Sequence, residues 1–486
     1  MPIADCPVKG RLSTFVFGNG LPAFALALIV AGAVFRPGDA PWISDEPMLL
    51  HGALYLNSTP GHFWKISLPF TPAPYGLLGT RGVHYGPLAV WIDQIFLVFT
   101  HNPIAMIAIR AAAVAAVNAL ALYWLAKSLR VTPWLAVAVM LSPWLWLYSR
   151  QLWDNSLCVP LSAMLLAAYA DFIMTRRPWS LRLAILCGML LLLVHLMAIA
   201  LIAAVGLHLA VMEFRSLWRF KWSLLAIVAI VTAVSWPYWS NLLHNYHQDI
   251  PGGTSPWRGY FFPLLGAHHL TAAGLENVLG DTWLATRSPI VAVAQWVSLI
   301  AFPAVWVAML LAIPRLWRVL RLSPRADPFD HIFAVAWAAV IFQSALDGFQ
   351  HVYEGPHYLN AAWIVYAAFL FFLARHAPAW IIGVYGASLL GVTVAIAVAI
   401  YQNAGMRSAN FGSALWSQID AVEEIQKFSG DSPLKIDVPE WTKHPVALTT
   451  LGELHPPPST QRPRRGILVH YRDASPLDAH IAVTAY

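Results

Sequence analysis

Two adjacent carboxylates, Asp45 and Glu46, follow the first apolar segment and open a long polar stretch. A carboxylate that is ionised near neutral pH can accept a proton from an attacking hydroxyl group and so act as a general base. The same pair would also suit the first turn of a helix, where Ser44 could cap the helix and negative charge is favourable. The pair alone leaves a catalytic and a structural interpretation open.

Further ionisable and aromatic side chains lie in the other segments that connect apolar runs. Each one taken singly could be an interfacial anchor or a satisfied surface charge. Together they would bring ionisable groups to one face of a membrane, as a site for an anionic lipid headgroup requires. These residues are Arg81, His84, Tyr85, Arg150, Asp154, His195, His357 and Tyr358.

Metal-ligand types occur in one short run, His244-Asn245-Tyr246-His247-Gln248-Asp249, but their spacing matches no strong metal pattern. The sequence contains no glycine-rich phosphate loop and no nucleophile elbow. The formal net charge of +6 comes from dispersed basic residues, unlike the basic face of a nucleic-acid-binding protein. We therefore expect no metal site and no required cofactor, with a divalent cation as the alternative, and no nucleic-acid partner.

The composition identifies the elements that must position these residues as membrane spans. Hydrophobic residues make up 58% of the chain and charged residues 11%, against about 25% charge in an ordinary soluble domain. Charged residues make up about 9% of residues 1–402 and about 20% of residues 403–486. We therefore predict an all-α multispan membrane domain in residues 1–402 and a small soluble domain in residues 403–486.

Apolar runs long enough to cross, or nearly cross, about 30 Å of hydrocarbon recur along the first of these domains. The stretch 181–214 is long for one span and short for two. Basic residues flank both of its ends and favour the cytoplasm, so the stretch must turn back near His195. The predicted spans are 15–37, 104–126, 132–148, 156–174, two within 181–214, 222–240, 289–313, 331–347, 357–374 and 379–401, about eleven in all.

The same charge distribution predicts a cytoplasmic N-terminus and a C-terminal domain on the periplasmic or extracellular side. The apolar stretch 85–100 contains Asp93 and Gln94, and counting it as a span would invert every later loop. We therefore predict that it is a helix lying along the outer membrane surface. The long outer loop 38–103 then contains both the acidic pair and this helix.

Residues 403–486 are predicted to form a small α/β domain. An amphipathic pattern indicates a helix near Leu415–Phe428. Strands are indicated at Leu434–Val438, Val446–Leu451, Gly466–Tyr471 and Ala479–Ala485. Such a domain could guide an acceptor to a site or merely cap the membrane domain, and the sequence favours neither role.

The order of several short motifs is informative where no single motif is. The motifs are the acidic pair Asp45-Glu46, Tyr85-Gly86-Pro87-Leu88 at the head of the surface helix, Arg110 early in the next span, Ser142-Pro143 followed by Tyr148-Ser149-Arg150 and Asp154, Gly188 to His195, and His357-Tyr358-Leu359. In this order the chain resembles the C-type glycosyltransferase superfamily, specifically its branch of protein O-mannosyltransferases and aminoarabinose transferases. Two lysines usual in that branch are absent, with His84 and Gly86 near one position and His195 at the other.

The resemblance implies a membrane glycosyltransferase that moves a sugar from a polyprenyl-phosphate carrier to an acceptor on the outer face by inverting displacement. It implies Asp45 as catalytic base, with Glu46 and then Asp154 as alternatives. The acceptor would be a hydroxyl group of a glycan, a lipid or a protein, and the short outer loops favour the bacterial inner membrane. The residues expected to bind the substrate and carrier phosphate are Arg81, His84, Tyr85, Arg110, Arg150, His195, His357 and Tyr358.

Two other classes of protein fit a multispan chain with polar groups. A transporter places its coupling charges near the bilayer midplane, often in repeated halves. Here the ionisable residues gather at the outer ends of spans and no internal repeat is evident. A non-catalytic subunit that binds a lipid-linked sugar is the second alternative, against which the intact acidic pair argues.

Overall fold

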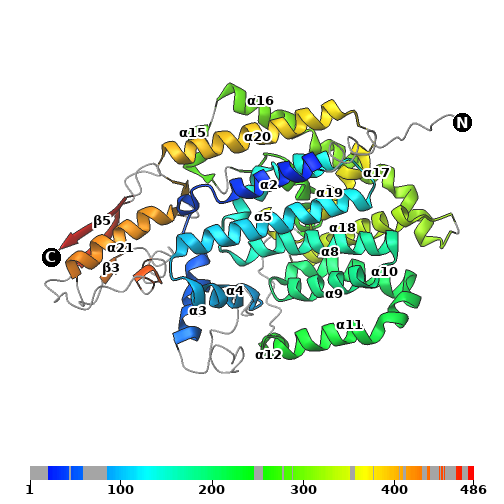
Figure 1. The fold of residues 1–486 in the computed structure, drawn as a ribbon, viewed down its shortest axis with the longest axis horizontal. Helices are drawn as coiled ribbons and strands as arrows, with labels where there is room; N and C mark the ends of the chain where they lie inside the picture. The colour runs from blue at the N-terminus through cyan, green and yellow to red at the C-terminus, as the bar shows by residue number, and fades with distance from the viewer. Residues whose placement is uncertain are drawn as a thin grey trace, which may run out of the picture.

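The structure is a bundle of helices with a small mixed sheet at one end (Figure 1). It is a computed structural model, and the residues that it describes are 20–42, 45–58, 85–245, 256–275, 279–286, 288–323, 325–350, 356–375, 377–403, 405–408, 412–429, 435–437, 448, 450–452, 454, 467–472 and 480–485.

The α-helices follow one another through most of the described chain. They are α2 (Leu21–Ala33), α3 (Glu46–Ser58), α4 (Leu88–Phe99), α5 (Pro103–Ser128), α6 (Pro133–Met140), α7 (Pro143–Ser149), α8 (Asp154–Thr175), α9 (Pro178–Leu192), α10 (Ile199–Met212), α11 (Phe214–Val234), α12 (Trp236–Asn245), α13 (Pro256–Phe261), α15 (Asp281–Thr286), α16 (Pro289–Ser298), α17 (Ala301–Leu320), α18 (Pro328–Gln350), α19 (Trp363–Ala374), α20 (Ala379–Gln402) and α21 (Leu415–Ser429). Short 3-10 helices are η2 (Pro37–Asp39), η3 (Leu196–Ala198), η4 (Phe262–Leu270) and η5 (Pro356–Leu359).

The apolar surface of the bundle is that of a multi-pass membrane protein. Six helices in the described part of the chain are long and apolar enough to cross a membrane. One of them, α11, buries only 6% of its most apolar stretch, and it exposes Trp222, Ile230 and Val234. A continuous apolar surface of this kind is unfavourable in water and favourable against lipid. The predicted total of about eleven spans stays a prediction.

The turn predicted near His195 is confirmed. Helix α9 ends at Leu192, His195 has an extended backbone, and η3 then leads into α10. The two helices have 15 and 14 residues, so each is about 20 Å long and shorter than the hydrocarbon layer. The positive charge at both ends of the stretch was therefore a correct guide to its reversal.

The predicted single span 132–148 is wrong in one respect, because two short helices, α6 and α7, replace one continuous helix. Ser142 has an extended backbone and Pro143 begins the second helix. Proline cannot donate a backbone hydrogen bond inside a helix, and it disfavours a helical conformation of the residue before it. The Ser142 hydroxyl donates to the carbonyl of His269 at 2.6 Å instead, so the break serves as a contact point for η4.

Helix α4 occupies the stretch predicted to be a surface helix. Its polar residues Asp93 and Gln94 are buried against the protein, while Val98 and Phe99 are exposed. This reverses the amphipathic arrangement of a helix in water, and it suits a helix whose outer face meets an apolar phase. Whether it lies along the membrane surface stays a prediction.

The described C-terminal residues contain a helix and strands, as the sequence indicated. Strand β3 (Lys435–Asp437) pairs in parallel with β4 (Ile467–Arg472), which pairs antiparallel with β5 (His480–Ala485), and α21 packs against β4 and β5. A two-stranded ribbon joins β1 (Arg407–Ser408) and β2 (Gly412–Ser413). The strand predicted at 446–451 is wrong, because the described positions 448, 450 and 451 are helical. The sequence cannot show this, since short apolar runs fit both periodicities.

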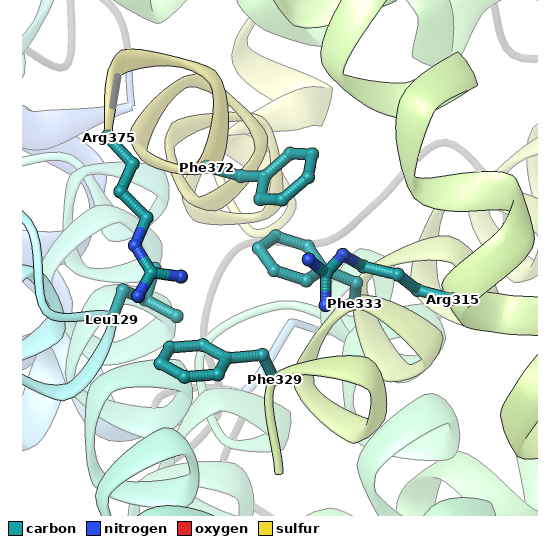
Figure 2. Close-up of a pocket in the computed structure, with 6 residues that line it drawn as sticks. All are labelled: Leu129, Arg315, Phe329, Phe333, Phe372 and Arg375. Carbon is teal, nitrogen blue, oxygen red and sulfur yellow. The ribbon is translucent and has the colours of Figure 1, made fainter. Parts of the chain in front are cut away.

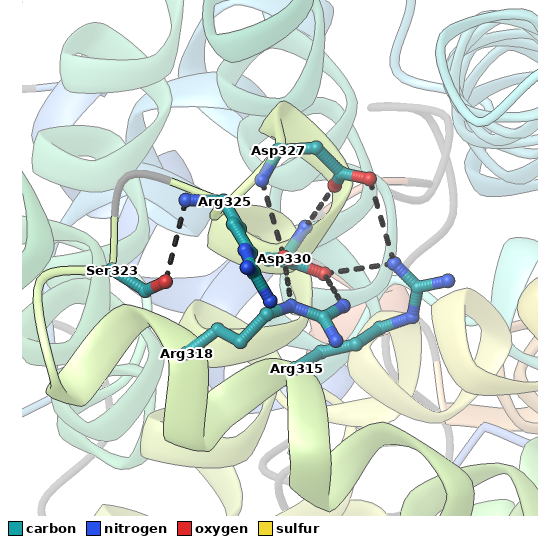
Figure 3. Close-up of polar contacts among 6 residues, drawn as sticks. All are labelled: Arg315, Arg318, Ser323, Arg325, Asp327 and Asp330. Atoms are coloured by element: carbon teal, nitrogen blue, oxygen red, sulfur yellow. Dashed lines mark hydrogen bonds and ion pairs between the residues drawn. The ribbon is translucent and has the colours of Figure 1, made fainter.

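An ionic cluster joins α17 to α18 at the other end of the bundle (Figure 3). The Asp330 carboxylate accepts hydrogen bonds from Arg318 at 2.7 and 2.8 Å and from Arg315 at 2.8 Å. Arg315 also lies over the Phe372 ring, and Arg375 lies over Phe329, on either side of a small pocket (Figure 2). The pocket offers about 10 Å³, enough for about one water molecule, so it is too small to be a substrate site.

Candidate functional site

The acidic pair lies where the first described loop enters α3. Asp45 directly precedes the helix and its carbonyl accepts the Leu49 amide, while Glu46 is in the first turn and is buried. The Asp45 carboxylate is only partly buried, and it accepts a hydrogen bond from the Trp153 indole at 2.9 Å. A base that must reach a substrate needs such partial exposure. The position at a helix start fits the structural interpretation of the pair, and the partial exposure of Asp45 fits the catalytic one.

The loop between α7 and α8 brings a third carboxylate beside the pair. Asp154 is fully buried at the first residue of α8, where one carboxylate oxygen accepts the Asn155 amide at 2.7 Å. Its other oxygen, Oδ2, has no hydrogen-bond partner among the described residues. A buried carboxylate oxygen without a partner is unfavourable, and such atoms in native proteins commonly face a missing ligand or water.

Arg110 fixes this loop from α5. Its guanidinium donates to the carbonyls of Leu152 at 3.0 Å and Trp153 at 2.5 Å, and to the Ser156 hydroxyl at 3.2 Å. It also lies 3.5 Å from the Asp93 carboxylate on α4. Arg110 is buried, and these contacts join α4, α5 and the start of α8. Direct contact between Arg110 and a carrier phosphate stays a prediction.

Arg150 is likewise buried, and it faces the loop before the acidic pair. Its guanidinium donates to the Arg36 carbonyl at 2.5 Å and lies over the Trp146 ring at 4.5 Å. Burial lowers the pKa of Arg150 to about 10, which the nearby Asp39 carboxylate opposes, so the side chain stays charged at neutral pH. Asp39 itself forms a 2.5 Å ion pair with Arg36. Neither Arg36 nor Asp39 was among the residues selected from the sequence.

Aromatic contacts connect Asp45 to the segment at η5. Trp153, which binds Asp45, lies 4.9 Å from the His357 ring, and His357 lies 4.2 Å from Tyr358. Asn360 donates to the Asn155 carbonyl at 3.2 Å and so holds this segment against the start of α8. The two regions that the sequence singled out, near residues 154 and 357, are therefore neighbours.

The same series of rings continues to the turn between α9 and α10. Tyr358 lies 6.3 Å from His195, and His195 stacks on Tyr85 at 4.4 Å. The turn is bonded to the start of α4, because the amides of Gly86 and Leu88 donate to the carbonyls of Val194 and Leu193. Six of the predicted or newly found residues thus form one connected group, namely Asp45, Trp153, His357, Tyr358, His195 and Tyr85.

The histidines of this group are neutral at physiological pH. Burial lowers the pKa of His357 to about 4, although the Asp45 carboxylate acts in the opposite direction. Burial, together with the nearby His357, lowers the pKa of His195 to about 3. The Nδ1 atom of His195 accepts the Met197 amide at 3.1 Å, so the ring proton is on Nε2. That buried Nε2 has no partner among the described residues, and it is a hydrogen-bond donor available to a ligand.

Some predicted residues cannot be placed, and some contacts were not predicted. Arg81 and His84 lie outside the described residues. His269, which the sequence analysis did not select, is buried, lies 5.6 Å from the Tyr148 ring, and is 2.6 Å from the Asn360 side-chain oxygen. Nothing local in the sequence marks this contact.

Within the described residues no group of three or more histidine, cysteine, aspartate or glutamate residues could hold a metal ion, and independence from metals stays a prediction.

Comparisons with known proteins identify the fold. No family model matches the sequence, and no curated protein matches it. Among solved structures, the chain is similar to the crystal structure of ArnT from Cupriavidus metallidurans bound to undecaprenyl phosphate, with a TM-score of 0.50, 14% identity and coverage of 93% of each chain. At this identity the similarity concerns the fold alone. The chain therefore shares the overall fold of ArnT, as the resemblance in the order of its motifs implied.

Proposed function

We propose that the protein is a glycosyltransferase of the bacterial inner membrane that takes a sugar from a polyprenyl-phosphate carrier and transfers it to an acceptor hydroxyl on the periplasmic face. The observation that carries the proposal is the connected group from Asp45 to Tyr85. It combines a partly exposed carboxylate, an available neutral imidazole donor and aromatic surfaces. The fold shared with ArnT, which was crystallised with undecaprenyl phosphate, supports a polyprenyl-phosphate donor.

The proposed reaction is a single displacement with inversion. The acceptor oxygen attacks the anomeric carbon, the bond from that carbon to the carrier phosphate breaks, and the acceptor proton passes to Asp45. The carrier phosphate is a stable leaving group, so the protein mainly has to position both substrates and stabilise the developing negative charge. The proposed displacement needs no nucleotide, no metal ion and no covalent intermediate.

The remaining residues have distinct proposed roles. The Nε2–H group of His195 and the Tyr358 hydroxyl would donate hydrogen bonds to the departing phosphate. Because His195 and His357 are neutral, the positive charge would have to come from arginines, which can bind phosphate through two parallel hydrogen bonds. We assign that role first to Arg81, with Arg110 and Arg150 contributing charge from their buried positions.

Sugar transfer from defined donors tests the proposal directly. Purified protein would be incubated with synthetic undecaprenyl phosphate carrying pentoses or hexoses and with bacterial envelope extract as the source of acceptor hydroxyls, and release of the free carrier would be measured by mass spectrometry. We expect release from at least one donor. Protein that moves labelled donor between vesicle leaflets but never releases the carrier would instead be a transporter, and donor binding without either activity would indicate a binding subunit.

A strain in which the gene is deleted can identify the physiological sugar donor. If the protein is the transferase, its sugar-loaded carrier should accumulate and the sugar should be missing from one envelope glycan, lipid or protein. Mass spectrometry of lipid-linked sugars from the deletion strain and its parent makes this comparison. Identical lipid-linked sugar pools in both strains would contradict the proposal.

A further inference from the structure

The loop that leads to Asp45 is paired with the C-terminal part of the chain. The Met406 amide donates to the Asp39 carbonyl at 3.0 Å, and the Leu415 amide donates to the Ala40 carbonyl at 2.9 Å. Next to the second bond, Pro41 and Ala414 form an isolated antiparallel bridge. The loop before the acidic pair is therefore joined through its backbone to residues 406 and 414–415, which lie beyond the last predicted span.

Two glycines show how closely the segments approach each other. A Cβ atom at Gly38 would overlap the indole of Trp416, and one at Gly405 would overlap Ala414. Gly405 also has a φ of +121°, which residues with side chains rarely adopt. Gly405 therefore needs glycine for its backbone conformation, and Gly38 leaves room for the Trp416 indole, which indicates a specific contact between the two segments.

Side chains from the C-terminal part then hold the loop on both sides of the acidic pair. Gln418 on α21 is fully buried, and its Nε2 donates to the Trp42 carbonyl at 2.6 Å. The hydroxyl of Thr450, which is also buried, donates to the Pro47 carbonyl at 3.2 Å. Asp45 and Glu46 thus lie between two backbone carbonyls that are each fixed by a buried polar side chain.

A glutamine at this position is a costly choice for packing alone. Burial of an amide is unfavourable unless it is hydrogen bonded, and an aliphatic side chain would fill similar volume without that cost. The bond to Trp42 compensates the burial and fixes the direction of the chain three residues before Asp45. The arrangement therefore stabilises one backbone position of the acidic pair.

We propose that the C-terminal segment is a positioning device for the catalytic carboxylate, and that Gln418 and Thr450 are its positioning residues. The inference rests on the proposed function in that Asp45 is the base. A base must lie within hydrogen-bond reach of the acceptor oxygen, and a misplacement of about 1 Å can cost about 100-fold in rate. The sequence left two roles open for this domain, acceptor guidance and simple capping of the membrane domain. The contacts support a third role, a structural link to the acidic pair.

Two variants test the proposal in the full-length protein. Gln418→Met keeps the side-chain length and removes the donor, and Thr450→Val keeps the shape and removes the hydroxyl. We expect kcat to fall about 10- to 100-fold in Gln418→Met, with the KM for the lipid donor changed less than about twofold. Ser417→Ala, at the exposed neighbouring position of α21, is the matched control and should keep the wild-type kcat.

Combination with Asp45→Asn separates positioning from general destabilisation. If Gln418 acts through Asp45, then Gln418→Met should lower the residual rate of Asp45→Asn by less than about twofold, because the base that it positions is absent. A reduction of the same size in both backgrounds would overturn the proposal. So would a loss of kcat that merely follows a loss of folded protein. If Gln418→Met does not fold, the same comparisons with Thr450→Val decide the question.

Hydrogen exchange gives a readout that does not depend on sugar transfer. In Gln418→Met, amides of residues 45–50 should exchange about tenfold faster, while those of α8 keep the wild-type rate. Unchanged exchange at 45–50 would overturn the positioning role even if the protein transfers no sugar. The two proposals can also fail separately. If the wild-type protein releases no carrier from any donor, the proposed function is rejected. Faster exchange in Gln418→Met would then still support the structural link between the C-terminal segment and residues 45–50.

Discussion

Replacement of Asp45 by asparagine separates the catalytic interpretation of the acidic pair from the structural one. Asparagine has nearly the same shape, and its side-chain oxygen can still accept the hydrogen bond that the Trp153 indole donates at 2.9 Å. It cannot take a proton from an acceptor hydroxyl. The substitution therefore removes the proposed chemistry while it leaves the contacts largely in place.

The expected loss of stability is small. A hydrogen bond to a charged group contributes about 1.5–3 kcal/mol and one to a neutral group about 0.5–1.5 kcal/mol, so the indole contact loses about 1 kcal/mol. The negative charge next to the first turn of α3 contributes about 0.3–1 kcal/mol more. Together these terms lower the free energy of unfolding by about 1–2 kcal/mol, which a folded membrane protein can tolerate.

The expected loss of activity is much larger. General base catalysis contributes about 10²- to 10⁴-fold in rate, equivalent to about 3–5 kcal/mol of activation free energy. We therefore expect kcat of Asp45→Asn to fall by at least 100-fold with a donor KM close to that of the wild type. If Asp45 only stabilised the helix start, kcat per folded molecule would not change.

The assay is carrier release from a defined polyprenyl-phosphate sugar, normalised to folded protein by size-exclusion chromatography. Asp420→Asn is the matched control, because it makes the same substitution at an exposed position of α21. More than about half of the wild-type kcat in Asp45→Asn would refute the assignment of the base. In that case Glu46→Gln, and then Asp154→Asn, would be tested for the missing role.

Four further outcomes follow from the structure. Burial lowers the pKa of His357 to about 4, so the folded state favours the neutral ring. The stability that results is fully present above pH 6.5 and is lost as pH falls through 4. The melting temperature of His357→Gln should therefore decrease less between pH 6.5 and pH 4 than that of the wild type. Gly86→Ala would place a methyl group on a backbone carbonyl of the adjacent turn and should lower the melting temperature, while Gly206→Ala, in open space, should not. Asp330→Asn removes the shared acceptor of two partly exposed arginines and should cost about 1–3 kcal/mol of stability with kcat unchanged. A cysteine introduced at Ser417 should react with an impermeant reagent from the periplasm, and labelling from the cytoplasm alone would invert the proposed topology.

Features that depend on periodicity and charge were predictable from the sequence. The reversal at His195 followed from basic residues at both ends of one apolar stretch, and the structure has it within three residues of the end of α9. The helix start at the acidic pair was one of the two interpretations that the sequence offered, since carboxylates are favourable there. Both predictions used signals that lie within a few turns of one another in the chain.

The parts of the site that depend on distant contacts were not predictable. Gln418 and Trp42 are 376 positions apart, and no local pattern records their hydrogen bond. Trp153 was not among the residues selected from the sequence, although its indole donates a hydrogen bond to Asp45. A single sequence shows which side chains could form hydrogen bonds, but their partners are set by packing.

Arg110 shows a related difficulty with charged residues inside an apolar span. The resemblance assigned it to the carrier phosphate, and an arginine in that position does need an anion or several acceptors. The structure supplies acceptors from the protein itself, at the carbonyls of Leu152 and Trp153 and at Asp93. The sequence alone cannot distinguish a charge that is held by the protein from one that is reserved for a ligand.

The backbone bonds between the start of α4 and the turn before His195 make these two elements a single mechanical unit. The amides of Gly86 and Leu88 are bonded to the carbonyls of Val194 and Leu193, and a Cβ atom at Gly86 would overlap the Leu193 carbonyl. A long lipid tail that displaced α4 would therefore carry His195 with it. In the proposed reaction, the position of α4 would therefore set the position of the Nε2–H donor of His195.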